Sequence, residues 1–382
     1  MPKLRVVLDG TPLLGPRTGV GRYTAALLAG LVELPGADLD VAATAFTWRG
    51  GAGLDAALPA GVRPAARRVP ARLLQDAWTR SERPPTEWLT GRADIVHGTN
   101  FVLGPLSSAR GVLTVHDLSY LRTPDTVSAA SARYATLVPR GLRRAAAVLT
   151  PSRAVADEVI AAYRLDPDMV TPTPLGVDAA WFDAAPPARG WLAARGLPER
   201  YLLFVGSAEP RKNLPVLLEA LRRLRADAPD TPPLALVGPP GWGPALDTSG
   251  LPADAVVTVG YLDDAELRSV VAGAAALCFP SRYEGFGLPP LEALAAGTRV
   301  VAADIPAVRE VVGAAAGVRL VTPGRWDVFA DDLAGALGAA LAEPTGTAQS
   351  ATQAAAGREH ARAFTWRRTA ELTAAVYRRV AG

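Results

Sequence analysis

The sequence has almost none of the residues that cross-link secreted proteins. Its 382 residues include a single cysteine, Cys278. One cysteine cannot form an internal disulfide, and the apolar residues around it predict a small buried side chain. This cysteine usage is typical of a reducing compartment, so we expect a cytoplasmic protein.

The sequence also lacks a long hydrophobic run. Its longest apolar stretch, residues 270–279, is much shorter than the roughly 20 residues that a helix needs to span a bilayer. The first residues lead directly into a predicted strand at 4–8, without the apolar core of a signal peptide. These features predict neither a membrane span nor export.

Neither sign of charge dominates, and no convincing metal motif is present. The 40 basic and 37 acidic residues give a net charge of +3, so no global field favours nucleic acid. Of the two Asp-x-Asp pairs, Asp38 and Asp40 enter a predicted strand, whereas Asp166 and Asp168 lie in a predicted surface turn. We therefore expect no metal ion and no other cofactor.

A dinucleotide-binding fingerprint is missing as well. That fingerprint places G-x-G-x-x-G directly after the first strand of the fold. Here Gly19 lies about ten residues beyond the predicted strand at 4–8. The spacing disfavours an NAD-dependent dehydrogenase.

Short apolar strands alternate with amphipathic helices along most of the chain, which predicts an α/β fold of two or three domains. Residues 50–68 look irregular, and residues 176–190 look like a linker. Strands are predicted at 4–8, 39–44, 94–97, 112–115, 147–150, 170–175, 201–205, 234–238, 255–259, 274–279, 299–303 and 318–321. Helices are predicted at 20–34, 71–80, 128–144, 214–226, 265–272 and 365–380.

The stretch at 281–297 combines a strand end, a glycine-rich loop and a helix start. Glu284 stands beside Gly285 and Gly287, and the prolines that follow suit the first turn of a helix. Gly297 is placed to end that helix. In an open parallel sheet a ligand binds at such a loop, and the helix start favours an anion such as a diphosphate.

Two carboxylates, Glu284 and Glu292, belong to this unit. A carboxylate can accept hydrogen bonds from two neighbouring hydroxyls, so the pair is suited to two hydroxylated rings with a diphosphate between them. The alternative is that both are solvated charges on a loop and a helix.

Other candidates follow strands in the first half of the chain. His116 comes directly after a predicted strand, in a position typical of catalytic residues in parallel sheets. Asp117 would either orient it or cap the next turn. His97 also ends a strand, and either faces an acceptor or is satisfied within the fold. Gly19 and Gly21 lie at a helix start, where they either admit a phosphate or form an ordinary loop.

The segment 284–297, EGFGLPPLEALAAG, resembles the signature of the family-4 retaining glycosyltransferases, in which two glutamates are separated by seven residues. The resemblance continues through residues 204–213, 116–117, 18–22 and 364–370, so it covers nearly the whole chain. It implies the GT-B fold, in which two Rossmann-like domains face a central cleft. It places an acceptor-binding domain at 1–183, a nucleotide-sugar domain at 184–364, and a terminal helix at 365–382 that packs back on the first domain.

The same resemblance implies transfer of a hexose from a nucleoside-diphosphate sugar to a hydroxyl, with retention. Arg211 and Lys212 would hold the diphosphate, Glu284 the sugar and Glu292 the ribose, while His116 would lie beside the sugar. No general base stands out, which agrees with a front-face mechanism in which the departing phosphate takes the proton. Further donor-binding residues implied by the family pattern are Gly19, Gly21, Ser207, Tyr261, Gly285, Phe286, Gly287 and Leu288. Ser207 departs from the pattern, because many family members have an arginine there.

The sequence is compatible with several donors and acceptors. The PRKN loop at 210–213 resembles the mannosyltransferase-like branch, which favours GDP-mannose, and the acceptor is a glycan, a lipid-linked sugar or a small molecule. The alternatives are a non-catalytic nucleotide-sugar-binding subunit and a GT-B epimerase or phosphorylase. Arg133, Arg140 and Arg144 share a predicted helix face, which would either contact an anionic membrane or be solvated.

Overall fold

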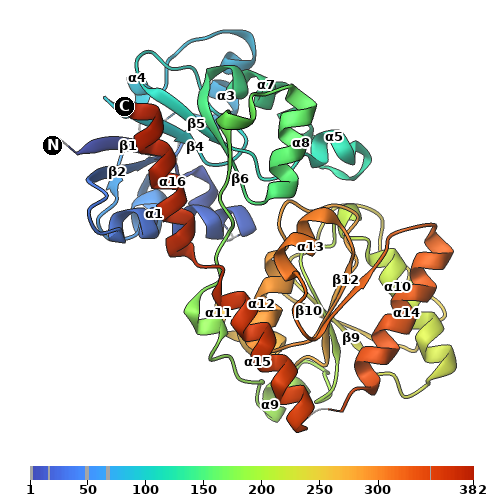
Figure 1. The fold of residues 1–382 in the computed structure, drawn as a ribbon. Coiled ribbons are helices and arrows are strands. Elements are labelled where there is room, and N and C mark those ends of the chain that lie inside the picture. Colours follow the sequence, from blue (N-terminus) through green and yellow to red (C-terminus); the bar gives the residue numbers. More distant parts are fainter. Residues whose placement is uncertain (1–2, 16–17, 48–50, 66–68, 345) are drawn as a thin grey trace. The chain divides into compact units, whose positions relative to one another are not determined.

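The computed structural model describes residues 3–15, 18–47, 51–65, 69–344 and 346–382. The chain forms two compact units. The N-terminal unit comprises Met1–Arg122, Ala129–Gly176 and Thr365–Gly382, and the C-terminal unit comprises Thr123–Ser128 and Val177–Phe364. Each unit is an open α/β sheet with helices packed against it (Figure 1).

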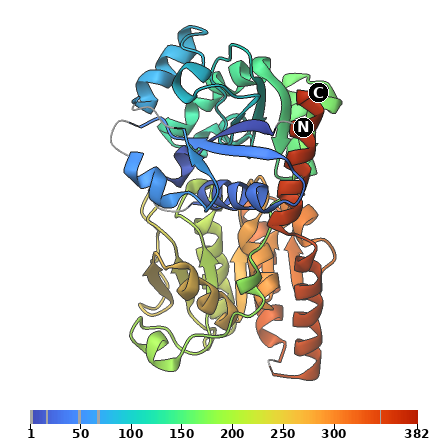
Figure 2. The same cartoon turned by 90° about the vertical axis from the view of Figure 1, so that its left-hand side faces the viewer.

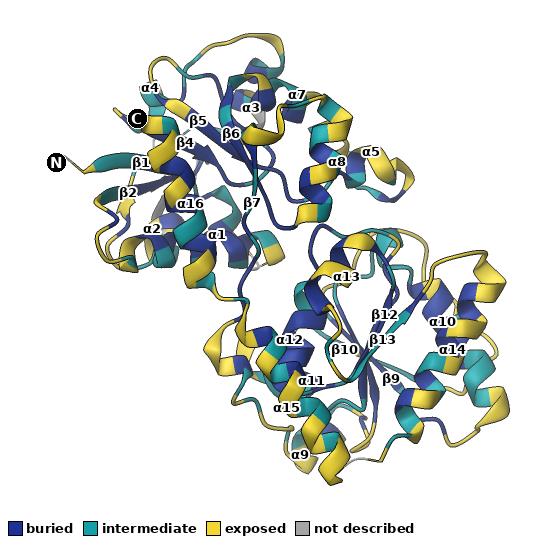
Figure 3. Cartoon of the chain, in the orientation of Figure 1, coloured by how far each residue is buried: buried dark blue, intermediate teal, exposed yellow. Residues whose placement is uncertain are grey.

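The described residues of the N-terminal unit form a seven-stranded sheet in the order β3-β2-β1-β4-β5-β6-β7. Every neighbouring pair is parallel. The strands are β1 (Leu4–Asp9), β2 (Leu39–Thr44), β3 (Arg63–Pro64), β4 (Ile95–Gly98), β5 (Arg110–Thr114), β6 (Ala145–Thr150) and β7 (Val170–Pro172). Apart from the short β3, they consist largely of buried apolar residues, as expected for strands covered on both faces (Figure 3).

The helices of this unit connect the strands. They are α1 (Gly19–Glu33), α2 (Gly51–Ala57), α3 (Ala71–Arg80), α4 (Glu87–Thr90), α5 (Ser119–Arg122), α6 (Ala129–Ala132), α7 (Tyr134–Arg144), α8 (Arg153–Tyr163) and α16 (Trp366–Ala381), with short 3-10 turns at Thr11–Leu13 and Pro167–Met169. Side-chain caps define several of their starts. Ser152, for example, accepts a hydrogen bond from the backbone N–H of Val155 and so caps the start of α8.

The C-terminal unit has a parallel sheet of six described strands, in the order β10-β9-β8-β11-β12-β13. The strands are β8 (Leu202–Val205), β9 (Leu234–Val237), β10 (Val256–Gly260), β11 (Ala276–Phe279), β12 (Val300–Ala303) and β13 (Val318–Val321). The helices are α9 (Arg189–Ala193), α10 (Leu214–Asp227), α11 (Asp264–Gly273), α12 (Leu288–Ala296), α13 (Pro306–Val312), α14 (Trp326–Ala342) and α15 (Ala348–Arg362), with 3-10 turns at Pro124–Thr126, Ala179–Trp181 and Pro210–Lys212.

The last helix, α16, returns to the N-terminal unit and packs along α1 (Figures 1 and 2). The two helices approach closely, because a side-chain carbon added to Gly30 would lie 2.8 Å from the Cβ atom of Ala370. Thr369 on α16 also donates a hydrogen bond to the carbonyl of Pro174, at 2.6 Å. The predicted doubly wound fold with a returning terminal helix is therefore confirmed.

Several local predictions are wrong. Residues 51–57 form α2 and residues 63–64 form β3, although the region was expected to be irregular; residues 50 and 66–68 of that region lie outside the described residues. On α3, Leu74 and Trp78 are buried, whereas the side chain of Leu73 is 67% exposed. Successive residues of a helix point about 100° apart, so the side chain of Leu73 faces solvent although that of its neighbour Leu74 faces the core.

The observed helices also differ from the predicted ones. The segment 128–144 divides into α6 and α7, and Pro139 lies inside α7. The predicted linker at 176–190 contains a 3-10 turn and the start of α9. Helices α13, α14 and α15 were not individually predicted. Within the described ranges, the structure contains no helix that is both long and apolar enough to cross a membrane.

Candidate active site

The candidate site of the C-terminal unit is formed by two loops that follow neighbouring strands. β8 and β11 pair directly, and the chain proceeds from β8 toward β9 on one side and from β11 toward β12 on the other. This boundary is the topological switch point of the sheet, where the two loops diverge and leave room for a ligand. The first loop carries Arg211 and Lys212, and the second carries Glu284.

Left-handed backbone conformations shape both loops. Asn213 has a φ of 58° between the 3-10 turn and α10, and Gly287 has a φ of 113° before α12. Asparagine and glycine are the residues that adopt such angles most readily. The turn at Asn213 ends the first loop directly after Lys212, so that both basic side chains are presented toward the second loop.

Glu284 lies between the two cations. One carboxylate oxygen accepts a hydrogen bond from Nη1 of Arg211 at 2.6 Å, and the other accepts one from Nζ of Lys212 at 2.7 Å. Arg211 Nη1 also lies 2.8 Å from the carbonyl oxygen of Tyr283. The predicted residues therefore meet in space, although more than 70 positions separate them in sequence.

Burial and charge act in opposite directions on the Glu284 carboxyl. Burial alone would raise its pKa, but the Coulombic attraction of Arg211 and Lys212, together with hydrogen bonds to the carboxylate, outweighs burial and lowers the pKa to about 2. The carboxylate is consequently ionised at neutral pH. It holds both cations in place and retains lone pairs that can accept further hydrogen bonds.

A second carboxylate, Glu209, belongs to this cluster and was not predicted from the sequence. One of its oxygens lies 3.5 Å from Nη2 of Arg211, and the other accepts a hydrogen bond from the hydroxyl of Ser207. Ser207 is therefore linked to Arg211 through Glu209. The signal available in the sequence was the position of Glu209 in the same short loop as the two basic residues.

The start of α12 offers fewer N–H donors than its position suggests. Leu288 carries an N–H group, but the next two residues are Pro289 and Pro290, which have none. An anion here would depend on the backbone N–H groups of the preceding loop, at Gly285, Phe286 and Gly287, together with Leu288. The two prolines thus reduce the number of N–H donors at the helix start, which the sequence predicts as a favourable place for an anion.

Glu292 lies in the second turn of α12 with 6% of its surface exposed. The alternative reading of this residue as a solvated helix charge is therefore wrong. Phe286 is 5% exposed, and its ring packs edge-on against Phe364, so its side chain serves the core. Tyr261, by contrast, is 58% exposed beside the carboxyl end of β10.

In the N-terminal unit, His116 follows β5 and is buried. Nε2 of its ring donates to the carbonyl of Thr99 at 2.8 Å, and the edges of Tyr23 and Phe101 surround it. Burial lowers the pKa of His116, so the ring is neutral at neutral pH. Asp117 accepts a hydrogen bond from the N–H of Ser119, which supports its role as a cap of the following turn.

Gly21 has a clear packing role at the start of α1. A Cβ atom at this position would lie 2.8 Å from the carbonyl oxygen of Pro12, and the hydroxyl of Thr18 accepts its N–H at 3.4 Å. Gly19 is the first residue of the same helix. Their proposed contact with the donor stays a prediction.

His97 is a core residue. Nδ1 lies 2.6 Å from the hydroxyl of Tyr377, and Nε2 lies 2.7 Å from the hydroxyl of Thr114. No part of the residue is exposed, and burial lowers its pKa to about 3. The reading in which this ring faces an acceptor is wrong, because both nitrogens bond within the fold.

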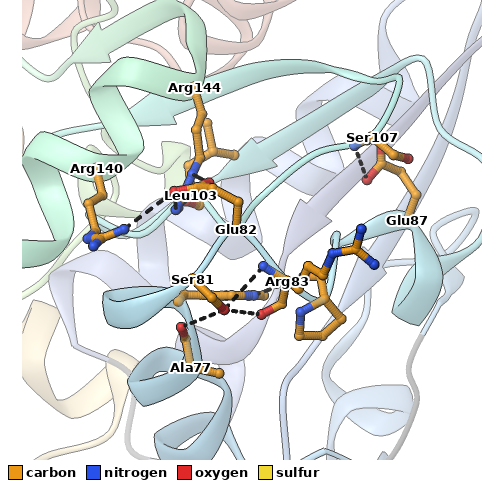
Figure 4. A network of polar contacts seen from close by, with 11 residues as sticks. Ala77, Ser81, Glu82, Arg83, Glu87, Leu103, Ser107, Arg140 and Arg144 are labelled. Carbon is orange, nitrogen blue, oxygen red and sulfur yellow. Dashed lines mark hydrogen bonds and ion pairs between the residues drawn. The ribbon is translucent and has the colours of Figure 1, made fainter.

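The predicted basic face on α7 is paired with acidic residues near α3. Glu82 lies 2.6 Å from Nε of Arg144 and 3.4 Å from Nη1 of Arg140 (Figure 4). Arg133 forms a further ion pair with Asp76. These arginines are consequently neither simply solvated nor a free basic surface.

The described residues were also compared with the ligand sets that hold metal ions. Across the described ranges, no group of three or more histidine, cysteine, aspartate or glutamate residues has the geometry of a metal site. At the switch point of the C-terminal sheet the structure brings together two cations, Arg211 and Lys212, and two carboxylates, Glu209 and Glu284. Such a set is suited to hydrogen bonding a polar, anionic ligand.

The arrangement defines the class of protein: two open α/β units, with a cluster of two cations and two carboxylates at the switch point of the second. The model of glycosyl transferases group 1 matches residues 194–339, and the model of glycosyltransferase family 4 matches residues 17–181. Together the two models match most of the chain. The chain belongs to glycosyltransferase family 4.

Similar proteins agree with this assignment. O-antigen chain mannosyltransferase B of Escherichia coli is 33% identical over 230 residues, which are 57% of this chain and 59% of the relative. The MMP alpha-(1->4)-mannosyltransferase of Mycolicibacterium hassiacum is 34% identical over 242 residues, or 62% of this chain and 55% of the relative. The matches to these two relatives thus span between a half and three fifths of their length.

A solved structure supports the fold. HepE from Anabaena, in complex with UDP and glucose, superposes with a TM-score of 0.68 at 18% identity, and the match covers 98% of this chain and 99% of that one. At this identity the likeness establishes the GT-B fold.

Proposed function

We propose that the protein is a retaining hexosyltransferase, which moves a hexose from a nucleoside-diphosphate sugar to a hydroxyl of an acceptor. The observation that carries the proposal is the buried cluster of Glu284 with Arg211 and Lys212 at the switch point of the C-terminal sheet. A diphosphate requires fixed positive charge, and charge that is shielded from water stabilises it more strongly.

Cleavage of the sugar–phosphate bond places negative charge on the leaving diphosphate. Lys212 donates one of its three N–H groups to Glu284, so the ammonium retains donors for phosphate oxygens. Arg211 adds a guanidinium whose position is set by Glu284 and the carbonyl of Tyr283. Both cations are held before the donor arrives, so little reorganisation is needed when charge develops.

The carboxylates take the hydroxylated parts of the donor. In the proposed arrangement Glu284 accepts hydrogen bonds from the transferred sugar, and Glu292 accepts them from the ribose. The departing phosphate takes the acceptor proton. Gly285, Phe286, Gly287 and Leu288 contribute backbone N–H groups, and Tyr261 and Ser207 complete the donor-binding set.

The N-terminal unit is proposed to bind the acceptor. This follows the assignment of residues 1–183 as the acceptor domain, 184–364 as the donor domain and 365–382 as the returning helix. His116 is proposed as a residue that orients the sugar; its neutral ring is suited to hydrogen bonding rather than to electrostatic attraction. Gly19 and Gly21 are kept as donor-contacting positions, and no metal or other cofactor is proposed.

GDP-mannose is the first donor to test. The two curated relatives are named as mannosyltransferases, which supports mannose. The structural neighbour HepE was solved with UDP and glucose, which supports a nucleotide-sugar donor. Because its nucleotide base is uracil and that of GDP-mannose is guanine, both bases belong in the test. The acceptor classes are glycans, lipid-linked sugars and small molecules, and peripheral contact with an anionic membrane is a further prediction.

The test is product formation with a panel of nucleotide sugars and hydroxylated acceptors, read by mass spectrometry. A new glycoside whose anomeric configuration, read by NMR, matches that of the donor supports the proposal. An inverted product contradicts retention.

Two alternatives make different products. A GT-B epimerase would convert the donor without a new glycoside, and a phosphorylase would require inorganic phosphate. A non-catalytic subunit would show thermal stabilisation by the nucleotide sugar, of about 2.7 kcal/mol at 100 times the dissociation constant, without a single turnover.

A further inference from the structure

Two acidic side chains balance the two cations of the candidate site. Arg211 and Lys212 contribute two positive charges, and Glu209 and Glu284 contribute two negative charges. Between 9% and 16% of each of these side chains is exposed, so water screens their charges only in part. The side-chain charges of this cluster therefore cancel before a ligand arrives.

The two carboxylates contact the cations in different ways. Glu284 accepts hydrogen bonds from Arg211 at 2.6 Å and from Lys212 at 2.7 Å. Glu209 approaches Nη2 of Arg211 only to 3.5 Å, which is an ion pair longer than an ordinary hydrogen bond. The guanidinium is thus held by Glu284 and by the carbonyl of Tyr283, whereas Glu209 adds negative charge beside it.

The loop holds the carboxylate of Glu209 through Ser207, whose hydroxyl donates a hydrogen bond to Oε1. The backbone of the same residue is fixed independently of its side chain. Its N–H group donates to the carbonyl of Ser207 at 2.8 Å, and its carbonyl accepts the N–H of Lys212 at 2.9 Å. A side chain at position 209 that keeps an oxygen acceptor should therefore leave the loop in place.

The proposed reaction changes the charge of the nucleotide. The bond between C1 of the hexose and the phosphate oxygen breaks, the acceptor oxygen bonds to C1, and the acceptor proton passes to the departing phosphate. A terminal phosphate loses its last proton at about pH 6, so at neutral pH this proton is released to water. The free nucleoside diphosphate then carries one more negative charge than the diphosphate of the donor.

We propose that Glu209 is a specificity-determining residue, which limits how tightly the site holds the nucleoside-diphosphate product. Its carboxylate repels each phosphate charge that the cations attract, and the repulsion is larger for the more highly charged product. The inference rests on the proposed transfer from a nucleoside-diphosphate sugar. It adds that the basic loop distinguishes donor from product by their charge.

Calorimetric titration of the full chain tests this inference. The ligands are GDP and UDP as products, and GDP-mannose and UDP-glucose as donors. Glu209→Gln removes the charge and keeps an acceptor for the hydroxyl of Ser207. Glu209→Asp keeps the charge and shortens the side chain, so the two variants separate the effect of charge from the effect of shape.

Glu343→Gln is the matched control. Glu343 lies 3.1 Å from Arg299 and also pairs with Arg319, so this carboxylate too neutralises arginines of the C-terminal unit. Arg299 directly precedes β12, at the amino edge of the parallel sheet, whereas the basic loop follows β8 at the carboxyl edge. Both glutamine variants change the net charge equally, so a general change of the protein's field would affect both.

We expect Glu209→Gln to bind the nucleoside diphosphate at least about fivefold more tightly, because unit charges about 4 Å apart repel by that factor even in bulk water. Donor affinity should rise by a smaller factor. Glu209→Asp and Glu343→Gln should keep the wild-type ratio of product affinity to donor affinity. In turnover assays, the product-inhibition constant of Glu209→Gln should fall together with its dissociation constant.

Weaker or unchanged product binding by Glu209→Gln would overturn the inference, since it would mean that the side chain positions Arg211 or has no effect on phosphate. An equal gain for donor and product would overturn it as well, and so would a Glu209→Asp variant that behaves like Glu209→Gln. These results would leave the transferase proposal standing if the wild-type protein forms a new glycoside. Failure of the wild-type protein to bind either nucleotide series would overturn both proposals.

Discussion

Lys212 and Glu284 form an ion pair with 2.7 Å between the ammonium nitrogen and a carboxylate oxygen, and only 11% and 9% of their side chains are exposed. The pair joins the loop after β8 to the loop after β11. Because Arg211 contacts the other carboxylate oxygen, Glu284 balances two buried cations. The cluster is thus both a candidate donor site and a structural link, and its two roles predict different effects of substitution.

Removal of the ammonium should impair turnover more than folding. In Lys212→Ala, Glu284 keeps its bond to Arg211, so the carboxylate remains partnered. The leaving diphosphate loses one fixed cation, and we expect kcat to fall by about 10²–10³-fold. Steady-state kinetics with the identified donor, together with far-UV circular dichroism, would check this. Wild-type turnover in a folded Lys212→Ala protein would contradict the site assignment.

Removal of the carboxylate should destabilise the C-terminal unit. Glu284→Ala leaves two largely buried cations without their shared partner, and breaking a buried pair in this way costs about 3–5 kcal/mol. Glu284→Gln keeps an oxygen acceptor and should cost less. Urea denaturation measures both. The matched control is Glu371→Ala, which removes an exposed pair with Arg367 on α16 and should change the midpoint little. Equal effects of Glu284→Ala and the control would refute the burial argument.

Acid should destabilise the N-terminal unit below neutral pH. Burial lowers the folded-state pKa of both His97 and His116, so the unfolded chain takes up protons first as the pH falls. The stability that these neutral rings contribute is complete above the unfolded pKa of about 6.5. This stability is lost as the pH falls below about 6.5. For His97 the loss continues down to its folded-state pKa of about 3.

The expected slope is about 1.4 kcal/mol per pH unit for each histidine. Denaturation at a series of pH values measures it. His97→Gln should reduce the slope, whereas Tyr377→Phe keeps the histidine and should lower stability at every pH with the slope largely retained. A slope that His97→Gln leaves unchanged would show that other groups cause the acid sensitivity.

Cys278 should be unreactive in the native protein. It lies on β11 with none of its surface exposed, and burial raises the pKa of its thiol to about 12. Since the thiolate is the reactive form, a thiol reagent should modify the protein only after denaturant is added. Counting modified thiols by mass spectrometry before and after denaturation tests this, and rapid native modification would show that the strand opens.

Transfer should not depend on a divalent metal. In the proposed site Arg211 and Lys212 stabilise the negative charge of the leaving diphosphate. A magnesium ion has this role in other transferases. Activity after dialysis against a chelator should therefore match untreated enzyme. Activity that the chelator abolishes and magnesium restores would refute this proposal.

Much of the architecture could be predicted from local patterns. Apolar runs such as Ala276–Phe279 form strands in the structure, since a strand buried on both faces needs a continuous apolar sequence. Gly297 ends α12 with a φ of 84°, as its type predicted. Exposure was less predictable, because Leu73 differs from Leu74 only by its direction around the helix.

The sequence by itself determined which segments become strands and helices, and which residues carry charge beside glycine-rich turns. These properties are local and depend on periodicity, proline and glycine. Only the tertiary structure decided that His97 is bonded to Tyr377 and that Glu284 lies between two cations. The reason is that strand order and helix packing bring together residues far apart in the chain, and their burial then sets the charge and hydrogen bonding of each.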